Sequence, residues 1–169
     1  MYKYIVYTLE KVNMPTKYRR QKRKTHKRTT HKRKTQYKHQ HVRCDHVKKD
    51  LVSIFMEMLA MIKVYHWNTH SFAQHKATDE IHAKLSENVD KFMEVLMGKK
   101  ESRLHDLNEK IQLIRSKNTV DFKKSIYEYR ECMIRLSDCF DSRKDSDLLN
   151  IRDEILSDLN QLLYLFTLD

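Results

Sequence analysis

The chain has 169 residues with one Gly and one Pro, 34% of its residues are charged, and its formal net charge is +11. So few turn-forming residues exclude a β-sandwich, a β-barrel or a Gly-rich nucleotide-binding loop, because those folds need such residues at their corners. No apolar run approaches the roughly eighteen residues of a membrane-spanning helix, so we expect no membrane partner.

The positive charge is concentrated at the N-terminal end. Residues 1–49 contain 17 Lys and Arg against 2 acids, whereas residues 50–169 carry a net charge of −4. We interpret residues 1–45 as a basic arm and residues 46–169 as a folded body. The arm has almost no aliphatic side chains to offset the entropy cost of ordering, so the sequence predicts that it is largely disordered.

This arm is typical of segments that neutralise phosphates and release their counterions, which predicts salt-sensitive, sequence-independent binding to nucleic acid, with DNA expected. A localisation signal or a solubilising tail is the alternative. The residues expected to contact phosphates are Lys17, Arg19, Arg20, Lys22, Arg23, Lys24, Lys27, Arg28, Lys32, Arg33 and Lys34.

The body contains amphipathic segments with the period of an α-helix. They predict long helices over residues 46–69, 73–97, 119–140 and 146–167, with a shorter helix over 104–114. Gly98 is expected to end the second helix. The predicted fold class is all-α: a four-helix bundle with the short extra helix in its crossover, preceded by the basic arm.

The second predicted helix has two distinct faces. Its apolar residues gather on one side, which predicts the core: Ala77, Ile81, Leu85, Phe92 and Leu96. Four polar residues gather roughly 150° around the helix: His75, Asp79, Asp90 and Glu94. They form two pairs with a spacing of four, and each pair can present two donors to one ion. Imidazole and carboxylate together suit Fe(II), Zn(II) or Mn(II).

One straight helix cannot close both pairs on a single ion. The eleven residues from Asp79 to Asp90 correspond to about 16 Å of helix rise, whereas a donor lies about 2 Å from its metal. A second copy packed antiparallel, crossing near Lys84 and Leu85, brings each pair against the other pair of its mate. The sequence therefore predicts an isologous dimer with two identical sites. His66, at the end of the first helix, is a further candidate ligand.

Simpler interpretations exist for these residues. Carboxylates four residues apart are common on solvated helix faces, and a histidine on an apolar stripe, such as His66, is more often a satisfied core residue. Three acids near the start of the last helix suit either an iron-entry pore or the preference of helix N-termini for negative charge. These are Asp145, Asp147 and Asp153.

The segment YHWNTHSFAQHKATDEI…NVDKFMEVLMG resembles the core motif of the Dps mini-ferritins, the DNA-binding proteins from starved cells. The match runs through His66-Trp67-Asn68 and both polar pairs, extends to the last helix, and covers roughly residues 46–167. The chain also resembles mini-ferritin-like proteins of large DNA viruses. The resemblance implies a ferritin-like bundle that forms a two-fold dimer, often within a twelve-subunit shell.

The Dps resemblance also implies ferroxidase activity, in which H2O2 or O2 converts Fe2+ to Fe3+. His66, His75 and Asp79 would come from one chain, and Asp90 and Glu94 from its mate. Together with the arm, this predicts an iron-sequestering protein that protects nucleic acid from oxidative damage. The alternative is a non-enzymatic protein that binds or condenses nucleic acid and retains a vestigial metal site. Trp67 would quench one-electron oxidants or anchor the dimer.

Three cysteines are present: Cys44, Cys132 and Cys139. The last two are separated by about 10.5 Å along one helix, which is too far for a disulfide between them. An odd count, with no secretory signal in the opening residues, is typical of a reducing intracellular compartment such as the cytosol, the nucleoid or nucleus, or a virus particle. We therefore expect reduced thiols.

Overall fold

The computed structural model describes residues 50–101, 103, 111, 113 and 115–168. The predicted arm over 1–45, with all its candidate phosphate-binding residues, lies outside this part of the chain, as does most of the short helix predicted over 104–114. The described residues form helices and connections without a strand, so the all-α fold class is confirmed for them. None of their helices is long and apolar enough to cross a membrane.

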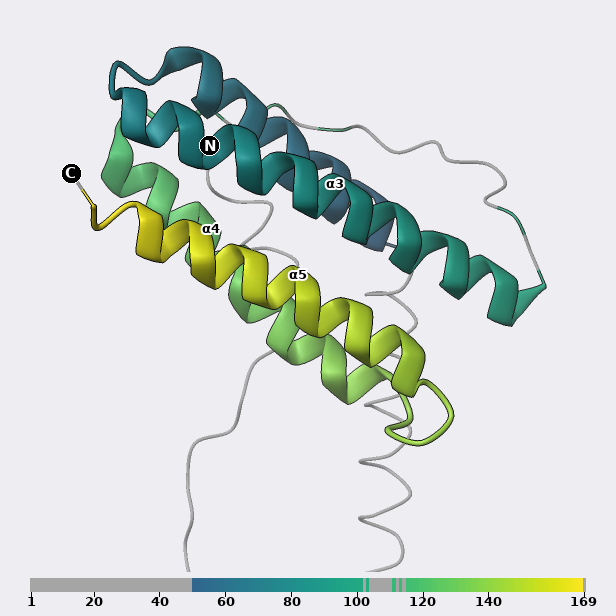
Figure 1. Ribbon diagram of the computed structural model, residues 1–169. Coiled ribbons are helices and arrows are strands. Elements are labelled where there is room, and N and C mark those ends of the chain that lie inside the picture. Colours follow the sequence, from purple (N-terminus) through teal and green to yellow (C-terminus); the bar gives the residue numbers. More distant parts are fainter. Residues whose placement is uncertain (1–49, 102, 104–110, 112, 114, 169) are drawn as a thin grey trace, which may run out of the picture. The chain divides into compact units, whose positions relative to one another are not determined.

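Four α-helices make up the described body, and their arrangement is drawn in Figure 1. The first is helical over residues 50–68 and is called the 50–68 helix. It is followed by α3 (Phe72–Lys100), α4 (Thr119–Leu136) and α5 (Ser146–Leu165), and the 3-10 turn η1 (Ser137–Cys139) extends α4. α5 packs against both α3 and α4. The predicted helix over 119–140 is thus shorter than expected, because its last turn tightens into η1.

The helix α3 runs past the glycine that was expected to end it. Gly98 keeps a negative φ and stays within the helix, which continues to Lys100. Glu101 adopts the left-handed conformation instead, with φ 49°, and its N–H bonds to the carbonyl of Gly98. The prediction that α3 ends at Gly98 is therefore wrong: the left-handed C-terminal turn falls three residues later, at a non-glycine residue.

The core lies between the four helices. The apolar face predicted for α3 is confirmed, since all five of its residues are buried. Phe55 of the 50–68 helix meets Phe92 edge to face, with ring centroids 5.6 Å apart. Tyr65 stacks on Phe122 of α4 at 3.9 Å. These contacts pack the 50–68 helix against both α3 and α4, and burial of each large apolar side chain contributes about 1.5–3 kcal/mol.

Lysine and acid side chains join the end of α3 to the start of α5. Lys99 Nζ lies 2.9 Å from an oxygen of Asp147 and 3.3 Å from an oxygen of Asp145. Asp153 pairs with Arg152 at 3.1 Å. The three acids considered for an iron-entry pore are therefore each bound to a cationic side chain, and two of them hold helices together.

The expectation of reduced thiols is wrong for one cysteine. Cys139, in η1, is disulfide-bonded, whereas Cys132 of α4 is a free thiol. The helical-spacing argument excludes only a bond between these two residues, and the structure agrees with that exclusion. The spacing argument leaves open a disulfide between Cys139 and a cysteine outside this helix.

Candidate metal centre

A short, hydrogen-bonded corner joins the 50–68 helix to α3. Ser71 caps α3 by accepting a hydrogen bond from the N–H of Gln74 at 3.3 Å. The Gln74 side-chain oxygen in turn accepts hydrogen bonds from Tyr65 Oη at 2.7 Å and from Thr69 Oγ1 at 3.1 Å. Because these bonds fix the corner, the last turn of one helix lies directly against the first turns of the next. His66 and His75 meet there.

The two histidines hold each other through reciprocal hydrogen bonds. His66 Nδ1 lies 3.0 Å from the backbone oxygen of His75, and His75 Nδ1 lies 3.2 Å from the backbone oxygen of His66. Their rings stack with centroids 3.9 Å apart. A carbonyl oxygen only accepts, so this geometry assigns the hydrogen to Nδ1 in both rings. Each Nε2 then keeps a lone pair, which is the tautomer that ligates metals while Nδ1–H bonds to a backbone carbonyl.

Thr78 completes the support behind His66. Its side chain is fully buried, and its hydroxyl lies 2.8 Å and 3.0 Å from the backbone oxygens of Gln74 and His75. The same Oγ1 lies 3.3 Å from His66 Nδ1 and is placed to accept its hydrogen. Sequence reasoning missed Thr78, although its position three residues after His75 places it one turn further along the same helix.

Asp79 lies beside the exposed edge of the histidine pair. One of its oxygens is 3.8 Å from His66 Nε2 and 3.3 Å from Lys63 Nζ. The Lys63 hydrogen bond holds the pKa of the Asp79 carboxyl below its usual value, and the positive charge of Lys63 adds to this effect. Any metal ion bound by Asp79 would share that carboxylate with the Lys63 ammonium group or displace it.

The second polar pair, Asp90 and Glu94, lies further along the same helix. Both residues are exposed, and neither side chain makes a hydrogen bond or an ion pair with another described residue. Eleven residues of continuous helix, about 16 Å, separate Asp90 from Asp79. The structure thus brings His66, His75 and Asp79 to one corner and leaves Asp90 and Glu94 apart. Within one copy, no three His, Cys, Asp or Glu side chains of the described residues are grouped to hold a metal.

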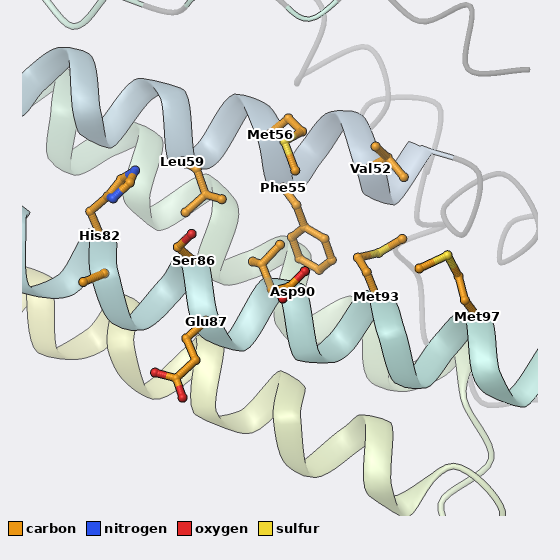
Figure 2. Close-up of a pocket in the computed structure, with 12 residues that line it drawn as sticks. Val52, Phe55, Met56, Leu59, His82, Ser86, Glu87, Asp90, Met93 and Met97 are labelled. Atoms are coloured by element: carbon orange, nitrogen blue, oxygen red, sulfur yellow. The ribbon is translucent and has the colours of Figure 1, made fainter. Parts of the chain in front are cut away.

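A groove of about 670 Å³ runs between the 50–68 helix and the C-terminal half of α3 (Figure 2). Its wall on α3 extends from His82 to Met97 and includes Asp90. His82 is another residue that sequence reasoning missed, although it lies two turns after His75 on the same face. Burial lowers the pKa of the His82 imidazole, and the nearby Lys63 charge lowers it further. Burial and Lys63 therefore favour neutral His82.

Comparison with known proteins gives a family but no described activity. No curated protein and no solved structure matches the chain. Residues 66–166 match a family described as "Family of unknown function (DUF5856)". This match covers more than half of the chain and includes all five candidate ligands, from His66 to Glu94. The chain therefore belongs to the DUF5856 family.

Proposed function

We propose that the chain is a Dps-like mini-ferritin. In this proposal its helices form a ferritin-like four-helix bundle, and two copies share sites that oxidise and sequester Fe(II). The observation that carries the proposal is the reciprocal His66–His75 pair. It orients both rings through Nδ1 and leaves their Nε2 atoms unbonded, with His66 Nε2 3.8 Å from an oxygen of Asp79. His66 is buried, whereas His75 and Asp79 are exposed.

The substrate would bind between two copies. His66, His75 and Asp79 of one copy supply imidazole and carboxylate donors, and Asp90 and Glu94 of the other copy supply carboxylates. This donor set suits Fe(II), and the hard carboxylate oxygens favour the more highly charged Fe(III). Two Fe(II) ions each give up one electron, and one H2O2 accepts both electrons as its O–O bond breaks to give two hydroxide ions. O2 is the alternative oxidant.

Iron oxidation in a set of variants tests this proposal. We expect His75→Ala and Asp90→Ala each to slow ferric-iron formation, followed by ultraviolet absorbance after addition of H2O2, by about 100-fold. His70→Ala is the matched control, because His70 is an exposed histidine in the same corner. Equal rates in the wild type and in both site variants would reject the site.

A mixing experiment tests whether the site is shared. His75→Ala and Asp90→Ala remove residues from opposite halves of each site, so a mixed dimer of the two variants retains one intact site and one doubly defective site. Random pairing makes half of the dimers mixed. Co-refolded variants should therefore recover about a quarter of the wild-type activity. A site built within one chain would recover none.

The basic arm supplies the second part of the proposal. Its charge would bring iron and peroxide removal close to DNA, and each phosphate contact releases counterions. Deletion of residues 14–43 should abolish DNA binding and flatten its dependence on salt, without slowing iron oxidation. If the truncated chain binds DNA as well as the full chain does, the arm is not the binding segment. DNA binding without iron oxidation would favour the non-enzymatic alternative.

A further inference from the structure

The outward face of α3 differs between its two halves. At the N-terminal end, Phe72 projects into solvent with 75% of its surface exposed. Over the C-terminal half, from His82 to Met97, the same helix forms one wall of the groove against the 50–68 helix. One half of the face therefore carries a projecting aromatic ring, and the other half is hollowed. An isologous interface needs such a self-complementary surface, because the same patch faces itself.

The groove ends at Met97, the residue that this two-fold arrangement sets opposite Phe72. In the antiparallel two-fold arrangement, whose axis passes between Lys84 and Leu85, residues 72–87 of one copy lie along residues 97–82 of the other. Phe72 and Met97 are each about 19 Å from that axis along the helix. The groove thus spans the stretch that the N-terminal half of a second α3 would cover, and Phe72 would lie opposite Met97.

The side chains near the axis allow two helices to approach closely. Ala83 and Ser86 lie on either side of it, and both are small, exposed and part of the groove wall. Two crossing helices come closest where they cross and diverge toward their ends. Small side chains at the crossing therefore allow a short distance between the helix axes, and larger side chains fill the wider gap at the ends. Asp79 of one copy lies opposite Asp90 of the other, between the axis and the ends of the contact. A metal ion bound there would offset the repulsion between the two carboxylates.

The far end of the groove is suited to an aromatic side chain. Figure 2 shows Val52, Met93 and Met97 at the end opposite His82, with Met56 above Phe55 on the facing helix. Methionine is flexible and polarizable, and its sulfur makes favourable contacts with aromatic rings. Met56 is 41% exposed, which is a large apolar exposure for a residue that has no other described role.

From these observations we infer that α3 of a second copy docks antiparallel along this groove and that its Phe72 enters the end lined by Met56, Met93 and Met97. The occupant is the same chain, because its own exposed Phe72 lies at the position that the two-fold arrangement sets against the methionine-lined end of the groove. The inference deepens the proposed function and rests on its two-fold arrangement. It assigns the dimer contact to apolar residues that do not bind iron.

Sedimentation of the full chain, with a chelator present to remove metal, tests the docking surface. The wild type should sediment as a dimer or a larger assembly of dimers. Phe72→Ser should weaken this dimerisation by about 10- to 100-fold in Kd, as expected for loss of a buried aromatic anchor. Val120→Ser is the matched control, because Val120 is equally exposed at the start of α4, and it should leave the dimer unchanged.

A second variant probes the axis. Ser86→Lys places two ammonium groups where the helices cross, and it should also weaken the dimer, whereas Ser157→Lys on the exposed face of α5 should not. Circular dichroism checks that all four variants fold. The inference is overturned if the metal-free wild type is monomeric, or if Phe72→Ser and Ser86→Lys dimerise like their controls. A dimer that responds as expected but does not oxidise iron would overturn the proposed function and leave this inference standing.

Discussion

His66 and His75 each bond through Nδ1 to the backbone oxygen of the other, at 3.0 Å and 3.2 Å, while their rings stack 3.9 Å apart. Neither ring can turn without breaking a hydrogen bond and the stacking contact. The two Nε2 atoms are therefore set in place by the corner between two helices before any ligand binds. Such preorganisation lowers the cost of binding, because less side-chain freedom remains to be lost.

This arrangement makes Thr78 a positioning residue. Its hydroxyl supports His66 from behind, and it is buried where water cannot replace it. Thr78→Val keeps the shape but removes the acceptor, so we expect Co(II), used as a probe for Fe(II), to bind about 10-fold more weakly. Titration followed by the visible absorbance of Co(II) measures this change.

Thr78→Ser provides the matching control, because it restores the hydroxyl while losing only a methyl group. It should bind Co(II) nearly as well as the wild type does, and both variants should unfold at similar temperatures. If Thr78→Val binds Co(II) like the wild type, or if the serine variant is as weak as the valine variant, the hydroxyl does not position His66.

Replacement of Gly98 by alanine should stabilise the protein, whereas the same replacement would be destabilising at a glycine that ended the helix. Gly98 is helical, and a Cβ added there would meet no atom within 4 Å. Gly98→Ala should therefore raise the free energy of unfolding by about 0.5–1 kcal/mol, through the better helix propensity and lower unfolded-state entropy of alanine. Urea unfolding measures it. A helix that ended at Gly98 in a left-handed turn would be destabilised by the same change.

The sequence predicts which residues of α3 are buried, but it does not predict where this helix ends. The apolar period on α3 predicts the buried face correctly, since burial of Ile81, Leu85 and Phe92 follows directly from a period of 3.6 residues. The end of α3 could not be placed, because Glu101 takes a conformation that its type rarely adopts. There the hydrogen bonds of the last turn outweigh residue preference.

The candidate site was predictable in composition but not in its support. Spacing on one helix identifies His75 and Asp79, because they lie four residues apart on one face. It does not show that the corner turns tightly enough to stack His66 on His75, or that Lys63 reaches Asp79 from the other helix. Those contacts depend on tertiary packing between elements, which local periodicity does not encode.

Cys132 should react slowly with alkylating reagents. Burial raises the pKa of its thiol to about 11, although the Arg135 charge opposes this effect. Only about one thiol in a thousand is then ionised at pH 8, and the thiolate is the reactive form. Iodoacetamide labelling of Cys132, followed by peptide mass analysis, should accelerate about tenfold per pH unit up to pH 10 and more than 100-fold on unfolding in urea. Equal labelling of native and unfolded chains at pH 8 would contradict this.

Asp158 links the stability of the body to pH. It is a buried carboxyl on α5 that accepts a hydrogen bond from Asn88 of α3 at 2.8 Å. Burial raises its pKa, while the Asn88 bond and the Lys84 charge oppose that change. A raised native pKa means that the folded chain holds this proton more tightly than the unfolded chain does. Its contribution to stability is therefore greatest in acid and is lost as the pH rises through the native pKa.

Asp158→Asn removes this titration and keeps an oxygen that can accept from Asn88. We expect the variant to be more stable than the wild type at pH 7, and the difference to vanish near pH 3, where the wild-type carboxyl is protonated as well. Thermal unfolding at both pH values measures the two differences. Asp153→Asn, an exposed change on the same helix, is the control and should show no such gain at pH 7. The opposite result would be a variant that is less stable than the wild type at pH 7 but equal to it at pH 3. The Asn88 hydrogen bond and the Lys84 charge would then stabilise the Asp158 carboxylate by more than its burial costs.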